Sequence, residues 1–275
     1  MNAHRMFTVM RADLLVLRQS RDFWIPMTIL AALFFIVFPT FLLLAVDRAG
    51  QIELVQQIGK TLDTLPAAVE QSLQGDTPEV RAQYAMAVYL FAPLAVVVPL
   101  TISTAIGANT IVGERERGTG EFLAHSPATE REIYIGKLIA SILPGYAATL
   151  VGFGIYALIV NTIVGPDVGG WFFPTAQWWV LMLWVVPPFI ALALSVVLRI
   201  SARVKSATAA QQASGLVTLP LILIAYGQSS GSLLGAGNAA GWWIGAVAWI
   251  GAIYGLARGA RSVSRERLLG ADIRG

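Results

Sequence analysis

The chain alternates between long apolar runs and short charged segments. Each run has at least the ~20 residues that a helix needs to cross a hydrocarbon core of roughly 30 Å. The runs at 84–112 and 138–164 contain no Asp, Glu, Lys or Arg. Because a charge at mid-bilayer costs about 2.5–3.5 kcal/mol on insertion scales, such runs favour lipid. The pattern predicts six membrane-spanning helices, at residues 23–46, 84–112, 138–164, 178–198, 207–226 and 238–257.

The composition agrees with an all-α membrane protein. Of the 275 residues, 56% are hydrophobic and 13% are charged, whereas about 25% of residues in a soluble domain are charged. The basic excess therefore gives no reason to expect a nucleic-acid partner, and the lipid bilayer is the predicted environment. We expect one transmembrane domain that covers residues 1–275.

Positive charges predict the orientation of the spans. Most of the 19 Lys and Arg residues lie in four segments, at 5–21, 115–137, 199–205 and 258–274. The remaining basic residues share the segment 47–83 with many acidic residues. By the positive-inside rule the four basic segments are cytoplasmic, and 47–83 is an outside loop. This pattern predicts cytoplasmic N- and C-termini in a multi-pass protein of the cell membrane.

Two segments outside the spans have helical periodicity. Residues 3–22 carry apolar side chains at spacings of three and four with arginines between them, which predicts an amphipathic helix on the inner leaflet or against a partner. In the outside loop, the apolar positions between 52 and 73 also repeat at helical spacing. Helices there would lie on the outer leaflet or cap a translocation path, and a solubilising spacer is the alternative.

The strip at 113–137 is the most heavily charged part of the chain. Glu114 to Arg117 alternate in sign, and Gly118, Thr119 and Gly120 then interrupt any helix that leaves the membrane. Phe122 and Leu123 form an apolar pair amid these charges. The strip is thus either a docking surface on a small separate helix or a solvated turn that only sets the topology.

The exit of this strip has a helix-start signal. Thr129 and Glu132 have the spacing of a capping box, immediately before an apolar run. Ser126 and Pro127 interrupt the chain just upstream, because the residue before a proline is disfavoured in the helical region. We expect the third span's helix to begin at Glu130.

The strip resembles the first cytoplasmic loop of type-2 ABC exporter permeases. The resemblance lies in residues 113–119, Glu121, Leu123, Ser126-Pro127, Arg131-Glu132 and the ending Gly136-Lys137-Leu138. It implies a coupling helix between spans 2 and 3, an elbow helix before span 1, and pairing of two like or related permeases with ABC ATPase subunits. The residues it assigns to ATPase docking are Glu114, Glu116, Arg117, Gly118, Thr119, Glu121, Phe122 and Leu123, with Arg131 and Glu132 holding the loop's exit.

The chain lacks the motifs of an ATP-hydrolysing or hydrolytic enzyme. No phosphate-binding G-x-x-x-x-G-K-S/T loop occurs, and without cysteine no thiolate chemistry is possible. Residues 227–231 match G-x-S-x-G, but the two histidines, His4 and His125, are predicted on the opposite side of the membrane. We expect no catalytic residue, metal or cofactor in this chain, and the resemblance places ATP and Mg on the partner.

The sequence is consistent with two functions. The first is the permease subunit of an ATP-driven exporter, which the resemblance implies. The second is an ATP-independent scaffold or channel-like protein whose charged loop recruits a soluble partner. The predicted spans carry no intramembrane charge of the kind that ion-coupled carriers use. This absence favours energy input through the loop at 113–137.

Overall fold

The protein is a bundle of long helices, described here from a computed structural model. The described residues are 2–49, 71–204, 206, 208–216 and 240–259, and they contain helices and no strand. Among them, four helices are long and apolar enough to cross a membrane: Arg21–Val46, Pro78–Glu116, Glu130–Ile163 and Ala176–Ser201. The prediction of an all-helical membrane protein is confirmed to this extent.

The first two spanning helices are each built from consecutive pieces. The N-terminal helix α1 (Ala3–Gln19) ends at Ser20, and α2 (Arg21–Ala32), the π turn η1 (Leu33–Val37) and α3 (Phe38–Ala49) follow it. The next spanning helix consists of α6 (Pro78–Ala85), η2 (Met86–Leu90) and α7 (Leu94–Glu116).

The remaining helices complete the bundle. The short α8 (Gly120–Ala124) is followed by α9 (Glu130–Ile163), which is 34 residues long, and by α10 (Gly165–Val168). The last described elements are α11 (Ala176–Val180), η3 (Leu181–Val185), α12 (Val186–Ser201) and α14 (Ala240–Gly259).

The helices are longer than the apolar runs that predicted them. Those of the second, third and fourth spans extend beyond 84–112, 138–164 and 178–198 at one or both ends. Within the segment 47–83, α3 continues to Ala49 and α6 starts at Pro78, where the Thr77 side chain caps the helix. Within the strip 113–137, α7 continues to Glu116 and α9 begins at Glu130, as the sequence predicted.

Other predictions fall on residues outside the described part of the chain. These are the helices expected between residues 52 and 70, most of the fifth span at 207–226, and the tail after residue 259. The segment predicted as the sixth span, 238–257, overlaps α14, which is not among the four helices named above.

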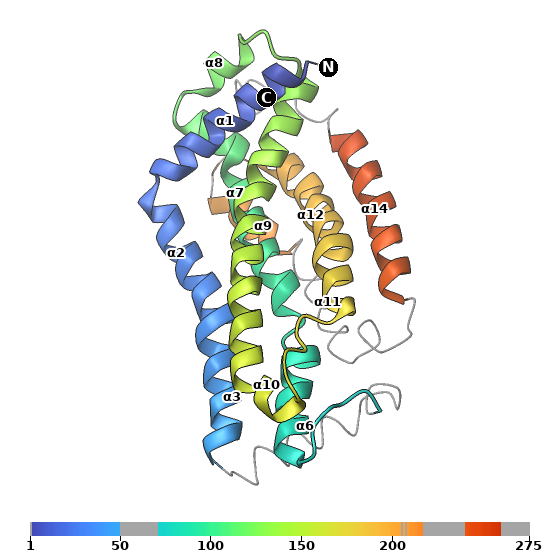
Figure 1. The fold of residues 1–275 in the computed structure, drawn as a ribbon. Helices are drawn as coiled ribbons and strands as arrows, with labels where there is room; N and C mark the ends of the chain where they lie inside the picture. The colour runs from blue at the N-terminus through green and yellow to red at the C-terminus, as the bar shows by residue number, and fades with distance from the viewer. Residues whose placement is uncertain (1, 50–70, 205, 207, 217–239, 260–275) are drawn as a thin grey trace.

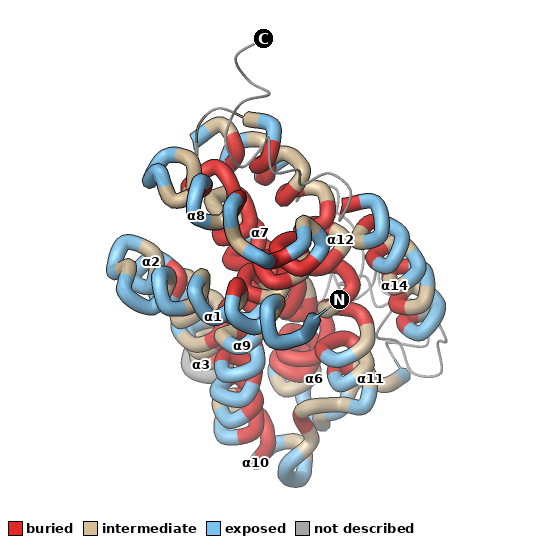
Figure 2. The backbone as a smooth tube through the Cα atoms, turned by 90° about the horizontal axis from the view of Figure 1, so that it is seen from above, coloured by how far each residue is buried: buried red, intermediate tan, exposed pale blue. Residues whose placement is uncertain are grey.

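The core of the bundle lies around α7 and α12. Figure 2 looks along the bundle and shows buried residues concentrated on these two helices and on the inward face of α9. In contrast, α2 is mostly exposed, whereas α14 has both exposed and buried residues along its length. Figure 1 shows α1 and α8 at one end of the bundle and α6 and α10 at the other.

Prolines in three of the helices follow π turns. Pro39, Pro93 and Pro187 come two or three residues after η1, η2 and η3, respectively. A proline removes a backbone hydrogen bond and clashes with the preceding turn, and a wider turn relieves that clash. The fourth spanning helix, Ala176–Ser201, therefore continues through Pro187 after a π turn.

Side chains from neighbouring helices bind carbonyl groups within these π turns. The Tyr156 hydroxyl donates to the Ala87 carbonyl at 2.6 Å, and the Trp178 indole donates to the Val88 carbonyl at 2.9 Å. At η3, the Tyr146 hydroxyl donates to the Met182 carbonyl at 2.7 Å. Backbone groups in lipid must be satisfied within the protein, so these contacts stabilise the irregular turns.

Candidate functional site

The charged strip folds into a compact structure at the α1 end of the bundle. Helix α7 ends at Glu116, and Gly118 follows with a φ of 71°. The Gly118 amide donates to the Arg115 carbonyl at 3.1 Å, and the Thr119 amide donates to the Glu114 carbonyl at 2.9 Å. This pair of bonds is a Schellman motif, which ends the helix and needs the left-handed conformation that glycine adopts easily.

The short helix α8 carries the apolar pair of the strip. Phe122 points outward and is 81% exposed, whereas Leu123 is half-buried and packs against the hydrophobic core. Glu121 is exposed beside Phe122, and its carbonyl accepts from the His125 ring at 2.8 Å. The two apolar residues therefore have different surroundings: Phe122 faces solvent and Leu123 anchors α8.

The capping box at the start of α9 is confirmed. The Thr129 hydroxyl accepts from the Glu132 amide at 3.3 Å, and the Glu132 carboxylate accepts from the Thr129 amide at 2.9 Å. The same carboxylate also accepts from the Asn2 amide at 2.5 Å, so it joins the beginnings of α1 and α9. Arg131, one residue earlier, is exposed.

Helix α1 lies directly on α9 and on the end of the strip. The Arg5 guanidinium donates to the Pro127 carbonyl at 2.7 Å. At Gly136 the two helices approach closely, because a Cβ atom there would lie 2.9 Å from the Met6 carbonyl and 3.0 Å from the Val9 Cβ. On this face, α1 therefore packs against α9 of the same chain.

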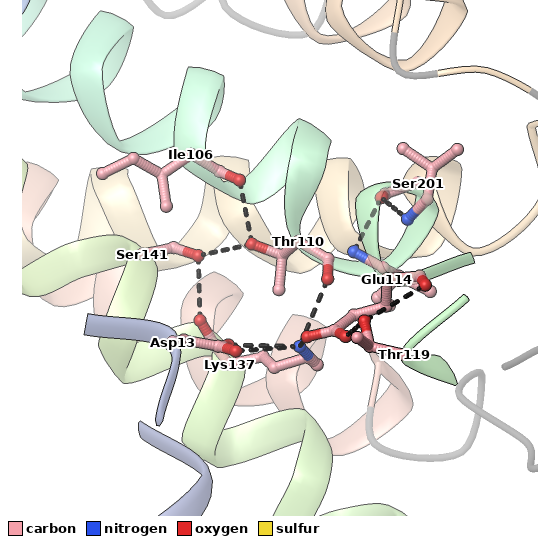
Figure 3. Close-up of polar contacts among 10 residues, drawn as sticks. Asp13, Ile106, Thr110, Glu114, Thr119, Lys137, Ser141 and Ser201 are labelled. Carbon is pink, nitrogen blue, oxygen red and sulfur yellow. Dashed lines mark hydrogen bonds and ion pairs between the residues drawn. The ribbon is translucent and has the colours of Figure 1, made fainter. Parts of the chain in front are cut away.

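A buried lysine connects these elements. The Lys137 side chain is 1% exposed, and its Nζ donates to both carboxylate oxygens of Asp13 at 3.2 Å, to Glu114 Oε1 at 3.1 Å and to the Thr110 carbonyl at 3.2 Å. Figure 3 shows Asp13 of α1, Glu114 of α7 and Lys137 of α9 converging on one point. We call Asp13, Glu114 and Lys137 the lysine cluster.

The lysine cluster also fixes the beginning of the strip. The Thr119 hydroxyl donates to the second oxygen of the Glu114 carboxylate, the one that does not face Lys137. Arg117 lies over α7, because a Cβ atom at Gly113 would be 3.2 Å from its Nη1. Glu114 thus joins the loop residue Thr119 to the buried lysine.

The electrostatics of the cluster depend on burial and pairing. Burial raises the pKa of the Asp13 carboxyl above its ordinary value of 3.8, and the Lys137 ammonium opposes that rise. A single lysine faces two carboxylates, and the nearby Arg117 guanidinium adds a second positive charge that also favours the ionised form of Asp13. The cluster is a structural ion network rather than a site with a free reactive group.

A cleft opens between α1 and the strip beside this cluster. Its volume is about 340 Å³. One wall comes from α1 and the other from α8 and the end of α7, and the lining residues include Ala12, Val16, Arg117, Phe122 and Ser126. Phe122 therefore stands at the edge of a concave surface that has both apolar and charged parts.

A second contact joins the end of α7 to the end of α12. The Arg115 guanidinium donates to the carbonyls of Ser201, at 3.1 Å, and Val204, at 2.6 Å. The Ser201 hydroxyl donates to the Ala108 carbonyl at 2.7 Å and accepts from the Val112 amide at 3.2 Å. The helix that carries the strip is thus fixed to α12 as well as to α1 and α9.

The structure adds three residues to those that the sequence assigned to this site. Asp13, Arg115 and Lys137 hold the strip in place, but none was counted among the docking residues. A lysine between apolar residues at the start of a span is a visible signal for Lys137, because burying such a charge requires a partner. No comparable signal pairs it with Asp13, since the two residues lie 124 positions apart.

Of the predicted docking residues, those that face solvent are Glu116, Arg117, Gly118, Glu121, Phe122 and Arg131. Glu114, Thr119 and Leu123 are half-buried and Glu132 is buried, so these four hold the strip's structure. Among the described residues, no group of three or more His, Cys, Asp or Glu side chains could hold a metal ion. The exposed residues of the strip therefore sit on a segment that is held in place by Glu114, Thr119, Leu123 and Glu132.

Comparison with known proteins identifies the family of the chain. Residues 7–236 match the family described as ABC-2 family transporter protein. This match spans α1, the strip with α8, and the spanning helices through α12. No curated protein matches the chain closely enough to add a named relative. The matched segment covers most of the chain, and the chain therefore belongs to the ABC-2 transporter family, as a membrane protein of that family.

Proposed function

We propose that the chain is the membrane-spanning permease subunit of an ATP-driven exporter. It would form the translocation path as a dimer, with a second copy or a related permease. A separate ABC ATPase subunit would bind ATP and Mg and dock on the segment 113–137 from the cytoplasmic side. Membership of the ABC-2 transporter family supports this role.

The exposure of Phe122 carries the docking proposal. The Phe122 side chain, on a five-residue helix, is 81% exposed. It therefore contributes little to the stability of the fold, because it buries almost none of its surface within the chain. Aromatic residues in the centre of an interface are frequent energetic hot spots. Phe122 would enter a groove of the ATPase, and the exposed Glu116, Arg117 and Glu121 would set its orientation.

The mounting of α8 suggests how ATPase movement would reach the membrane. Thr119 binds Glu114, Glu114 binds Lys137, and Lys137 binds Asp13, so the strip is linked to α7, α9 and α1. Arg115 links the same region to α12. A force on Phe122 would therefore act on helices on both sides of α7 rather than bend a free loop.

Co-purification of the ATPase tests this proposal. We expect Phe122→Ala to weaken binding of the co-expressed ATPase by about 30-fold or more, because an aromatic hot spot contributes roughly 2 kcal/mol or more. The thermal stability of the isolated permease should not change, since Phe122 contacts little of the chain. Trp171→Ala is the matched control, because Trp171 is also exposed, at 68%, but follows α10 at the other end of the bundle.

A charge-reversal variant tests the coupling part of the proposal. Glu116→Lys combined with Arg117→Glu should leave ATPase binding measurable but separate ATP hydrolysis from export, because rim charges affect orientation more than affinity.

Wild-type binding and transport in the Phe122→Ala protein would refute docking through α8. Transport that continues without any ATPase would instead favour the scaffold or channel-like alternative.

A further inference from the structure

An apolar groove runs along the outer surface between the first spanning helix and α9. Its volume is about 350 Å³, within the range of small-ligand pockets. Helix α2 and the π turn η1 both contact α9, and Figure 1 shows α2 beside α9. The lining residues are Trp24, Met27, Thr28, Ala31, Ala32, Ile36, Pro144, Ala147, Ala148, Val151, Gly152 and Ile155.

Small side chains keep the groove open. Ala31 and Ala32 on one helix face Ala147 and Ala148 on the other, and they leave a space that larger residues would fill. Below them the helices touch, because the Phe35 ring packs on Gly152 so closely that a Cβ there would lie 2.5 Å from its Cδ2. The close contact between Phe35 and Gly152 therefore holds the two helices together next to the groove.

The groove faces the lipid. Both of its walls belong to helices that are long and apolar enough to cross a membrane. Trp24, Thr28 and Val151 are exposed along its length. An apolar space that opens into hydrocarbon is filled by apolar chains, because no water is available to occupy it.

Positive charge lies at one end of the groove. Arg21, Trp24 and Thr28 are spaced by three and four residues, so they share a face of α2. At 1.5 Å per residue, Trp24 lies about 4.5 Å and Thr28 about 10 Å further along the helix than Arg21. Arg18, in the last turn of α1 and three residues before Arg21, is a second exposed positive charge, and Asp22 beside Arg21 is an exposed negative one, so this segment carries a net positive charge.

We infer that an anionic phospholipid occupies this groove as a bound, resident lipid. Its phosphate lies at Arg18 and Arg21, and one acyl chain lies between α2 and α9. The Trp24 indole lies at the depth of the ester groups, where it can donate a hydrogen bond, and Thr28, about 10 Å below Arg21, lies beside the acyl chain. Guanidinium groups suit phosphate because they offer several donors in a fixed plane.

Fluorescence quenching by brominated lipids tests the inference, because bromine quenches tryptophan only at close range. The full chain is reconstituted in phosphatidylcholine vesicles that contain a minor fraction of dibrominated phosphatidylglycerol or, in parallel, dibrominated phosphatidylcholine. The signal of Trp24 is the difference between wild type and Trp24→Phe. We expect brominated phosphatidylglycerol to quench Trp24 more strongly than the zwitterionic lipid does.

Two variants separate headgroup binding from chain binding. Arg18→Gln with Arg21→Gln should remove the preference for phosphatidylglycerol, by roughly fivefold per arginine, since each basic residue near anionic lipid contributes about 1 kcal/mol. Ala148→Phe fills the groove and should also abolish the preference. Leu143→Phe, on the exposed surface of the same helix but outside the groove, should leave the preference unchanged.

Two results would overturn the inference. Equal quenching of Trp24 by both brominated lipids in the wild-type protein would show that the groove holds bulk lipid without headgroup selection. Absence of Trp24 quenching by either lipid would show that protein covers the groove, such as a second copy of this chain.

Discussion

Lys137 Nζ lies 3.2 Å from the Asp13 carboxylate, although the two residues are 124 positions apart in the chain. This contact joins the N-terminal helix α1 to the start of α9 at a point where the lysine is almost completely buried. Because Glu114 binds the same ammonium group from α7, three helices share a single positive charge. The stability of this end of the bundle should depend on that charge.

Replacement of Lys137 tests this dependence. We expect Lys137→Met to cost about 3–5 kcal/mol, because removing one partner of a buried ion pair leaves the other charges uncompensated. The measurement is the melting temperature of the purified protein in detergent. Adding Asp13→Asn and Glu114→Gln to the same protein should restore part of the loss, because no unpaired carboxylate then remains. A Lys137→Met protein as stable as wild type would contradict a structural role for the cluster.

The pH dependence of stability should report the Asp13 carboxyl. Its pKa in the folded chain is raised by burial, above an ordinary value of 3.8. A raised folded-state pKa means that the folded chain binds this proton more tightly than the unfolded chain does. The contribution to stability is therefore fully present below pH 3.8 and is lost as the pH rises through the folded-state pKa.

The Asp13→Asn variant isolates this contribution, because asparagine does not titrate. We expect the melting temperature of wild type minus that of Asp13→Asn to fall as the pH rises from below 3.8 to neutrality. A difference that grows with pH would mean that Lys137 outweighs burial and lowers the Asp13 pKa. Carboxyl groups outside the lysine cluster cancel in the subtraction at each pH, whereas Glu114 does not, because it shares Lys137 with Asp13.

The packing of α14 on α12 gives a third prediction. A Cβ atom at Gly255 would lie 2.5 Å from the Ser195 Oγ, whereas one at Gly251 would make an ordinary 3.7 Å contact with Leu192. Gly255→Ala should therefore lower the melting temperature and Gly251→Ala should not, because only the former blocks a close helix approach. Ser195→Ala combined with Gly255→Ala should recover stability. Equal behaviour of the two glycine variants would show that α14 packs elsewhere.

Single cysteines can test the proposed orientation, because the chain has none of its own. His125 and Asp167 are both exposed, and they lie next to α8 and within α10, at opposite ends of the bundle. An impermeant thiol reagent should label a cysteine at 167 in intact cells and one at 125 only after permeabilisation. Labelling of position 125 from outside would reverse the orientation and place α8 beyond the reach of a cytoplasmic ATPase.

The sequence by itself determined the local features of this protein. The apolar runs predicted the four spanning helices that the structure describes, because the free energy of moving a side chain into lipid depends on that side chain and its depth. Gly118 and the Thr129–Glu132 capping box predicted where α7 ends and α9 begins, since helix termination depends on neighbouring residues. The apolar pair Phe122 and Leu123 was also visible, but the sequence did not distinguish the surroundings of the two residues.

The tertiary structure decided what those features contact. It separated Phe122, which faces solvent, from Leu123, which packs inward, because the direction of a side chain on α8 depends on how α8 sits on α7. It showed that Lys137 binds Asp13 and Glu114, and that Arg115 binds the end of α12. The contact of Lys137 with Asp13 joins residues 124 positions apart, and those of Arg115 with α12 and Val204 join residues 86 and 89 positions apart. Their free energy depends on burial and geometry that no local pattern specifies.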